Sequence, residues 1–147
     1  MREGLFSMSF DVFLNFDGDC HEALVFYAKV FQLDMPQQIM TYGQSPGGGF
    51  ADADKDRILY TSLPIFGCNV MFSDCPSGSD YVKGTNFALT LGTHDADEIK
   101  RIYDALMDGG EADMPLGKTF FSELYAMVTD RFDITWQLSQ SPFGQEA

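Results

Sequence analysis

The feature that most constrains this chain is a strand, turn and helix pattern that occurs twice. In its first copy, residues 10–16 (FDVFLNF) alternate as in a strand with two distinct faces, and Asp17-Gly18 follows as a turn. Asp19 stands three residues before Glu22, which is the spacing of a helix N-cap with a reciprocal partner. Apolar residues then recur on one face of the predicted helix: Ala23, Leu24, Tyr27, Val30 and Phe31.

The second copy follows the same order. Residues 86–92 (NFALTLG) predict a strand that places Phe87, Leu89 and Leu91 on one face, and Asp95 and Glu98 repeat the cap spacing. Gly109-Gly110 ends the second helix, whose apolar face consists of Ile99, Ile102, Tyr103 and Leu106. The recurrence predicts two copies of one module. The alternative is an α+β protein in which two amphipathic helices simply follow strands.

Three further strands are predicted in each module. They are residues 35–42, 58–63 and 69–73 in the first, and 111–114, 124–129 and 134–139 in the second. Module one then spans about 9–74 and module two about 85–140 within one domain, joined by a polar connector at 74–83. Residues 43–56 contain three consecutive glycines and favour a lid or hairpin excursion. Residues from 141 onward are expected to fray.

Charge and composition exclude several classes of partner. The net charge is −13, which argues against nucleic acid and anionic membranes and favours a cationic small molecule or simply an acidic surface. No apolar run approaches the ~18 residues of a membrane span, and residues 1–7 lack a secretory signal. The three cysteines form no Cys-x-x-Cys pair, so a reducing cytoplasm is expected. Cys20, in the first helical turn, is either an activated thiolate or an inert buried thiol.

Three stretches resemble the vicinal-oxygen-chelate superfamily of glyoxalases, extradiol dioxygenases and bleomycin-resistance proteins, and more narrowly its PhnB-like branch. They are FLNFDGDCHEALVFYAKVF, NVMFSDCPSG and DALMDGGEADMPLGKTFFSELYAMVTDRFDITWQL. Met114-Pro115-Leu116, residues 127–130 and Trp136 are the most specific to the branch, whereas Ser122 replaces a frequent glycine. The resemblance implies an α+β fold of two βαβββ modules, whose curved mixed sheets surround a shared cavity with the helices outside.

The resemblance also implies four metal-ligand positions, one on the first and one on the last strand of each module. In this sequence they fall on Asp11 (or, one residue further on, Val12), Met71, Ala88 and Gln137. Ala88 cannot coordinate and the Met71 thioether is too soft for a hard divalent ion, so we expect no metal site and no cofactor. His21 and His94 lie beside the helix caps and are not expected to replace the missing ligands. A methyltransferase label is attached to the branch, but no glycine-rich strand-to-helix turn suited to a methyl donor is present.

Alternate residues of the strands predict the lining of a small-molecule cavity. The expected ligand-binding residues are Asp11, Phe13, Asn15, Met71, Ser73, Thr90, Phe121, Glu123 and Gln137, with Ala88, Phe120 and Thr135 nearby. Phe13 and Met71 could instead only fill the core. Glu123 is the candidate general base, because an aromatic-rich loop could desolvate its carboxylate.

The leading hypothesis is a metal-independent, PhnB-like protein that binds a small molecule, with its catalytic status open. One alternative is a glyoxalase- or dioxygenase-type enzyme with Asp11, Glu123 and Gln137 as rearranged metal ligands. Another is a resistance protein that sequesters a cationic drug. A homodimer is predicted, because 14 Phe, 6 Tyr and one Trp are many for the core of one 147-residue domain.

Overall fold

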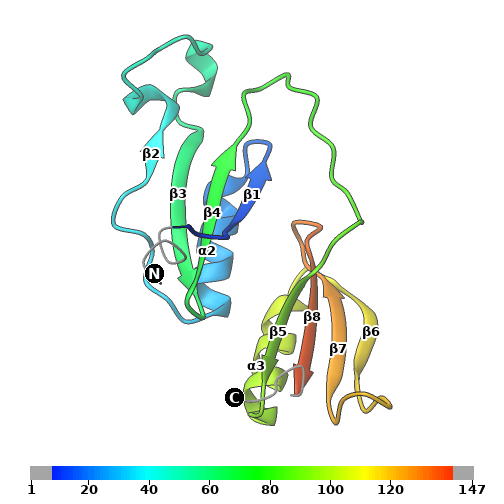
Figure 1. The fold of residues 1–147 in the computed structure, drawn as a ribbon. Helices are drawn as coiled ribbons and strands as arrows, with labels where there is room; N and C mark the ends of the chain where they lie inside the picture. Colours follow the sequence, from blue (N-terminus) through cyan, green and yellow to red (C-terminus); the bar gives the residue numbers. More distant parts are fainter. Residues whose placement is uncertain (1–7, 141–147) are drawn as a thin grey trace. The chain divides into compact units, whose positions relative to one another are not determined.

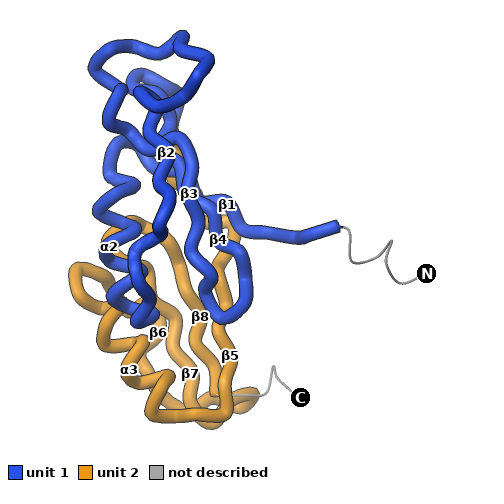
Figure 2. The backbone as a smooth tube through the Cα atoms, turned by 90° about the vertical axis from the view of Figure 1, so that its left-hand side faces the viewer, with its two compact units in different colours: residues 1–81 blue, residues 82–147 orange. Residues whose placement is uncertain are grey.

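The computed structural model describes residues 8–140, so our expectations for residues 1–7 and for the tail from residue 141 lie outside the described residues. The chain divides into two compact units between Tyr81 and Val82. Unit 1 precedes this division and unit 2 follows it (Figures 1 and 2).

Unit 1 contains one helix and a four-stranded mixed sheet. Its elements in chain order are β1 (Val12–Phe16), α2 (Cys20–Val30), β2 (Met40–Thr41), β3 (Ile58–Ile65) and β4 (Cys68–Asp74). The strand order is β1-β4-β3-β2, with β1 parallel to β4 and the other neighbours antiparallel (Figure 1). Two short 3₁₀ turns, Tyr42–Gln44 and Asp52–Asp54, interrupt the glycine-rich loop between β2 and β3.

Unit 2 repeats this arrangement. Its elements are β5 (Leu89–Thr93), α3 (Ala96–Leu106), β6 (Glu111–Gly117), β7 (Tyr125–Thr129) and β8 (Thr135–Gln140). The strand order is β5-β8-β7-β6, and β5 runs parallel to β8 as β1 does to β4. The predicted pair of βαβββ modules in an α+β fold is therefore confirmed.

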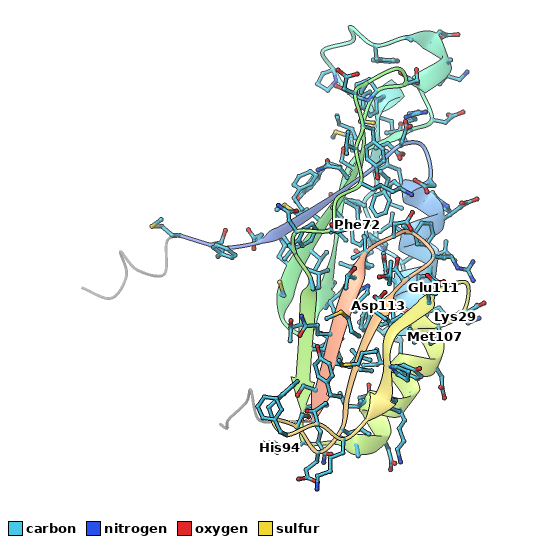
Figure 3. The ribbon with its side chains drawn as sticks, turned by 90° about the vertical axis from the view of Figure 1, so that its right-hand side faces the viewer. Lys29, Phe72, His94, Met107, Glu111 and Asp113 are labelled. Atoms are coloured by element: carbon cyan, nitrogen blue, oxygen red, sulfur yellow. The ribbon has the colours of Figure 1, made fainter. Side chains whose placement is uncertain are left out.

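The core of each unit lies between the helix and one face of the sheet. In unit 1, the predicted apolar face of α2 is buried, and the rings of Phe16 and Phe72 stack with centroids 5.9 Å apart. Phe72 projects from β4 and also contacts Tyr27 of α2 (Figure 3). In unit 2, the core includes Ile99, Ile102, Leu106, Ala126, Val128, Trp136 and Leu138. Within residues 8–140, no helix of the same unit packs on the other face of either sheet.

The helix starts differ from the prediction in unit 1. The Asp19 side chain makes no capping hydrogen bond. Instead Asp74, which is 2% exposed at the end of β4, accepts hydrogen bonds from the backbone N–H groups of Gly18 (2.7 Å) and Cys20 (3.1 Å). A distant carboxylate thus satisfies donors that a local cap usually serves. Asp95 does cap α3, as predicted, by accepting from the N–H groups of Asp97 and Glu98.

Glu98 does not return a bond to the cap residue, because its carboxylate accepts from the Arg101 guanidinium at 2.7 Å. The predicted strand 35–42 is reduced to Met40–Thr41. Phe87, expected to share a strand face with Leu89 and Leu91, precedes β5 and is 56% exposed. Pro64 and Ile65 lie beyond the predicted strand 58–63 but belong to β3, and the turn is Phe66-Gly67 with both φ angles positive.

Candidate functional site

The open face of unit 1, meaning the sheet face away from α2, collects most of the site residues predicted in the first module. Along β1, Leu14 and Phe16 are buried whereas Phe13 and Asn15 are exposed, as strand alternation requires. The register sets Phe13 beside Met71 and Asn15 beside Ser73 on β4, while Ser62 of β3 also pairs with Met71. We call Phe13, Asn15, Tyr60, Ser62, Met71 and Ser73 open face 1.

Aromatic surface dominates open face 1. The Phe13 and Tyr60 rings lie 6.4 Å apart between centroids, and they are 46% and 44% exposed. Sequence reasoning missed Tyr60, although its alternation with Leu59 and Thr61 in the third predicted strand was the available signal. Asp11 lies just before β1, half-buried, and accepts a hydrogen bond from the Ser9 hydroxyl at 2.7 Å. An aromatic pair flanked by amide, hydroxyl and carboxylate groups is the composition of a small-molecule surface.

The open face of unit 2 is richer in hydrogen-bonding groups. Thr90 of β5 and Met127 of β7 both pair with Gln137 of β8, which places all three on the face away from α3. The Tyr125 hydroxyl donates to Gln137 Oε1 at 2.8 Å. With Tyr125, Thr129, Thr135 and Asp113, these three residues form open face 2.

Burial raises the pKa of the Tyr125 phenol, which therefore stays protonated and donates. This bond uses the carbonyl oxygen of the Gln137 amide as an acceptor, whereas the amide nitrogen is a donor only. Thr129 donates to Asp113 Oδ2 at 2.6 Å and lies 3.1 Å from the Thr135 hydroxyl oxygen. Asp113 projects from β6 (Figure 3). Tyr125 and Asp113 were absent from the predicted set, because their roles depend on contacts between strands.

The loop from Lys118 to Leu124 covers one end of open face 2. The Phe121 ring meets the Tyr125 ring edge-on at 5.0 Å, and Ser122 lies 3.0 Å from the Ser139 hydroxyl. This loop and Gln140 line a hollow of about 400 Å³. Ser122, which replaces the frequent glycine, is 6% exposed and donates to backbone carbonyl oxygens there.

Glu123 does not have the environment expected of a general base. Its side chain is 73% exposed and pairs with Lys118 at 3.6 Å. Phe120 is 100% exposed and does not shield this carboxylate. The desolvation on which the predicted catalytic role depended is therefore missing.

The cysteines and histidines lie off the open faces. Cys20 is fully buried, and burial, followed by the charges of Asp74 and Asp19, raises the pKa of its thiol strongly. The inert alternative for Cys20 is the one that this environment favours. His21 lies in α2 and His94 in the turn between β5 and α3 (Figure 3), both exposed.

The four implied ligand positions do not fit a divalent metal ion. Neither Asp11 nor Ala88 lies within its strand, and the residues level with Met71 and Gln137 are Phe13 and Thr90. The Gln137 carbonyl oxygen, its coordinating atom, accepts from Tyr125. Among residues 8–140, no three His, Cys, Asp or Glu side chains gather closely enough to hold a metal ion. Of the four positions, only the Asp11 carboxylate and the Gln137 amide oxygen are hard donors and none is an imidazole, which is fewer ligands than such an ion requires.

The two βαβββ units agree with the fold that the resemblance to the vicinal-oxygen-chelate superfamily implies. The family model described as 3-demethylubiquinone-9 3-methyltransferase matches residues 8–139, and the chain belongs to this PhnB-like family. Protein YjdN of Escherichia coli (strain K12) is 27% identical over 142 residues, covering 90% of this chain and 95% of YjdN. None of the helices in residues 8–140 is long and apolar enough to cross a membrane.

Solved structures support the same fold. PA1353 from Pseudomonas aeruginosa aligns with a TM-score of 0.82 and 29% identity, over 91% of this chain and 98% of that one. A putative 3-demethylubiquinone-9 3-methyltransferase, PhnB protein, from Bacillus cereus aligns with a TM-score of 0.76 and 22% identity, over 91% of this chain and 100% of that one. The fosfomycin resistance protein FosX from Listeria monocytogenes was solved with Mn(II) and a dihydroxypropylphosphonic acid. It aligns with a TM-score of 0.62 and 11% identity, over 92% of this chain and 94% of that one. The likeness to the last two concerns the fold alone.

Proposed function

We propose that this protein binds a small organic molecule on the open faces of its sheets, without a metal ion. The observation that carries the proposal is the contrast between these faces and the ligand positions. The faces hold an exposed aromatic pair, Phe13 and Tyr60, and an amide fixed by Tyr125. The four positions that would hold a metal ion offer one carboxylate, Asp11, together with a thioether, a methyl group and an amide oxygen that is already hydrogen bonded.

The names of the relatives suggest two other activities. Methyl transfer would need a site for a methyl donor, and neither strand-to-helix turn, Asp17–Asp19 or His94-Asp95, is the glycine-rich turn that cradles such a cofactor in doubly wound folds. Metal-dependent chemistry of the glyoxalase or dioxygenase type would need ligands supplied in another arrangement. The proposal therefore concerns binding, and any catalysis would depend on a bound organic substrate.

The test combines metal analysis with ligand binding. Protein purified without chelator should contain well below one equivalent of zinc, nickel, manganese or iron. A set of aromatic compounds screened by thermal shift should include compounds that raise the melting temperature of the wild type but not of Phe13→Ala or Gln137→Ala. Phe87→Ala is the matched control, because Phe87 is exposed but lies outside the open faces. A stoichiometric metal, or stabilisation retained in both variants, would overturn the proposal.

We further propose a homodimer in a reducing cytoplasm. Several large apolar side chains are more than half exposed: Phe10, Phe66, Val82, Phe87 and Phe120. Aromatic residues are enriched in the buried centres of protein interfaces, and a symmetric pair is the commonest assembly. The free thiols of Cys20, Cys68 and Cys75 suit a reducing compartment. Light scattering at micromolar concentration should give twice the chain mass of 16.4 kDa, and a value near 16.4 kDa would refute the dimer.

A further inference from the structure

The charges on the two open faces restrict the class of ligand. In the part of the chain that the structure describes, every lysine and arginine lies off the strand positions of open faces 1 and 2. Lys29, Lys100 and Arg101 belong to the helices, and Lys55 to a loop. The other cations are engaged in ion pairs: Arg57 with Asp17 and Asp54, Lys83 with Asp133, Lys118 with Glu123, and Arg131 with Asp108.

The charges that do lie at these faces are negative. Asp11 precedes the Phe13 strand on the same alternation, and Asp113 is hydrogen bonded to Thr129 of open face 2. Glu111 pairs in register with Thr129 and extends this acidic edge (Figure 3). The chain as a whole carries a net charge of −13. An anion approaching either face would meet repulsion from these carboxylates, and no guanidinium, ammonium or imidazole group of residues 8–140 lies at the strand positions of either face.

The uncharged part of open face 1 favours a flat ligand. The Phe13 and Tyr60 rings are tilted by 46° and remain nearly half exposed, with the Met71 thioether next to Phe13 across the strand pair. Aromatic rings and thioethers both make favourable contacts with a further ring. Asn15, Ser62 and Ser73 bring amide and hydroxyl groups to the same surface.

From these observations we infer that open face 1 binds an aromatic compound without negative charge, and that phosphonates and other anions are excluded. This inference rests on the proposed function and gives it a ligand class. This ligand class differs from that of FosX, whose structure contains Mn(II) and a dihydroxypropylphosphonic acid.

Two fluorescent probes with the same ring system test the inference. N-phenyl-1-naphthylamine is uncharged, and 8-anilinonaphthalene-1-sulfonate carries an added sulfonate. The neutral dye should bind at least about tenfold more tightly, because the sulfonate would be brought from water to an acidic surface. Phe13→Ala should weaken binding of the neutral dye at least about fivefold, whereas Phe87→Ala should leave it unchanged.

Charge and bulk of the sulfonate are distinguished by two further measurements. Asp11→Asn should tighten binding of the anionic dye about two- to threefold without affecting the neutral one, and added salt should narrow the gap between the dyes. Equal binding of both dyes, lost together in Phe13→Ala, would overturn the charge inference and leave the proposed function standing. Failure of both dyes to bind would contradict the ligand class and count against the proposed function. Circular dichroism would verify that each variant is folded.

Discussion

The two units start their helices by different means, although they share one topology. In unit 2, α3 is capped from its own sequence, since Asp95 accepts from the N–H groups of Asp97 and Glu98. In unit 1, α2 receives no bond from the Asp19 side chain, and Asp74 reaches across from β4. Asp74 also accepts from the Ile58 N–H at 3.0 Å, so one buried carboxylate joins three segments of the chain.

The strand registers place Asp74 of unit 1 and Gln140 of unit 2 at corresponding positions. Phe16 pairs with Asp74 at the end of β1 and β4, and Thr93 pairs with Gln140 at the end of β5 and β8. Gln140 also reaches the strand-to-helix turn, where its amide donates to the His94 carbonyl oxygen at 3.1 Å. A side chain at the end of the last strand in each unit is therefore hydrogen bonded to the turn before the helix. Only in unit 1 does this hydrogen bond replace the local cap, so unit 1 depends more on contacts between residues distant in sequence.

The largest effect is expected from removing the carboxylate of unit 1. Asp74→Ala should lower the free energy of unfolding by about 3 to 5 kcal/mol, because three backbone donors lose their acceptor in a buried site. Urea unfolding followed by circular dichroism measures the loss. Ser73→Ala, next to it on the open face, is the control and should cost below about 0.5 kcal/mol. If Asp74→Ala lowered the free energy of unfolding by less than about 1 kcal/mol, Asp74 would not be the group that replaces the local cap of α2.

Unit 2 has its own buried carboxylate, at a different place. Asp130 accepts from the N–H groups of Phe132 and Ile134 within its turn, and from Trp136 Nε1 at 2.9 Å. Asp130→Ala should cost about 2 to 4 kcal/mol, somewhat less than Asp74→Ala because its backbone partners are close in sequence. Trp136 is the only tryptophan, so its fluorescence reports unfolding of unit 2 directly. Asp133→Asn, in the same turn but exposed, should change little, and an equal loss there would refute the assignment.

The caps themselves should differ between the two helices. Asp95→Ala should cost about 1 kcal/mol, the usual value for a helix N-cap. Asp19→Ala, at the matching position of α2, should cost less than about 0.3 kcal/mol, since its side chain makes no capping bond. Thermal unfolding of the two variants compares them directly. Equal losses would mean that both helices are capped locally.

The smallest effect concerns acid. The hydrogen bond from the Arg57 guanidinium, at 2.9 Å, holds the pKa of Asp17 below its ordinary value of 3.8. A carboxylate with a lowered pKa contributes stability above its unfolded value and loses it as pH falls through the folded one. Unit 1 should therefore lose a small contribution below about pH 4 that Asp17→Asn lacks. The free energies of unfolding of the wild type and of Asp17→Asn, measured from pH 6 to pH 2.5, should converge at the acid end. A constant difference between them would contradict the lowered pKa of Asp17.

Local patterns in the sequence predicted the repeated topology because they depend on residues close together in the chain. Strand alternation placed Leu14 and Phe16 against the helix, and helical spacing identified the buried faces of α2 and α3. The same alternation placed Phe13 and Asn15 of open face 1 and Gln137 of open face 2, since a period of two fixes which residues share a face. The Asp95 cap was equally readable, as its partners follow within three residues.

What alternation could not predict is how neighbouring strands are set against one another and which polar groups they bring together. The register placed Phe13, not Asp11, beside Met71, and Thr90, not Ala88, beside Gln137. Strand pairing also brings the Tyr125 hydroxyl to the Gln137 amide and the Asp74 carboxylate to the first residue of α2, whereas Glu123 is exposed to solvent beside Lys118. Local periodicity in the sequence therefore determines which residues share a helix face or a strand face. Hydrogen bonds between distant residues form only once the strands have paired. Tyr125 and Gln137 are 12 residues apart, and Asp74 and Cys20 are 54 apart.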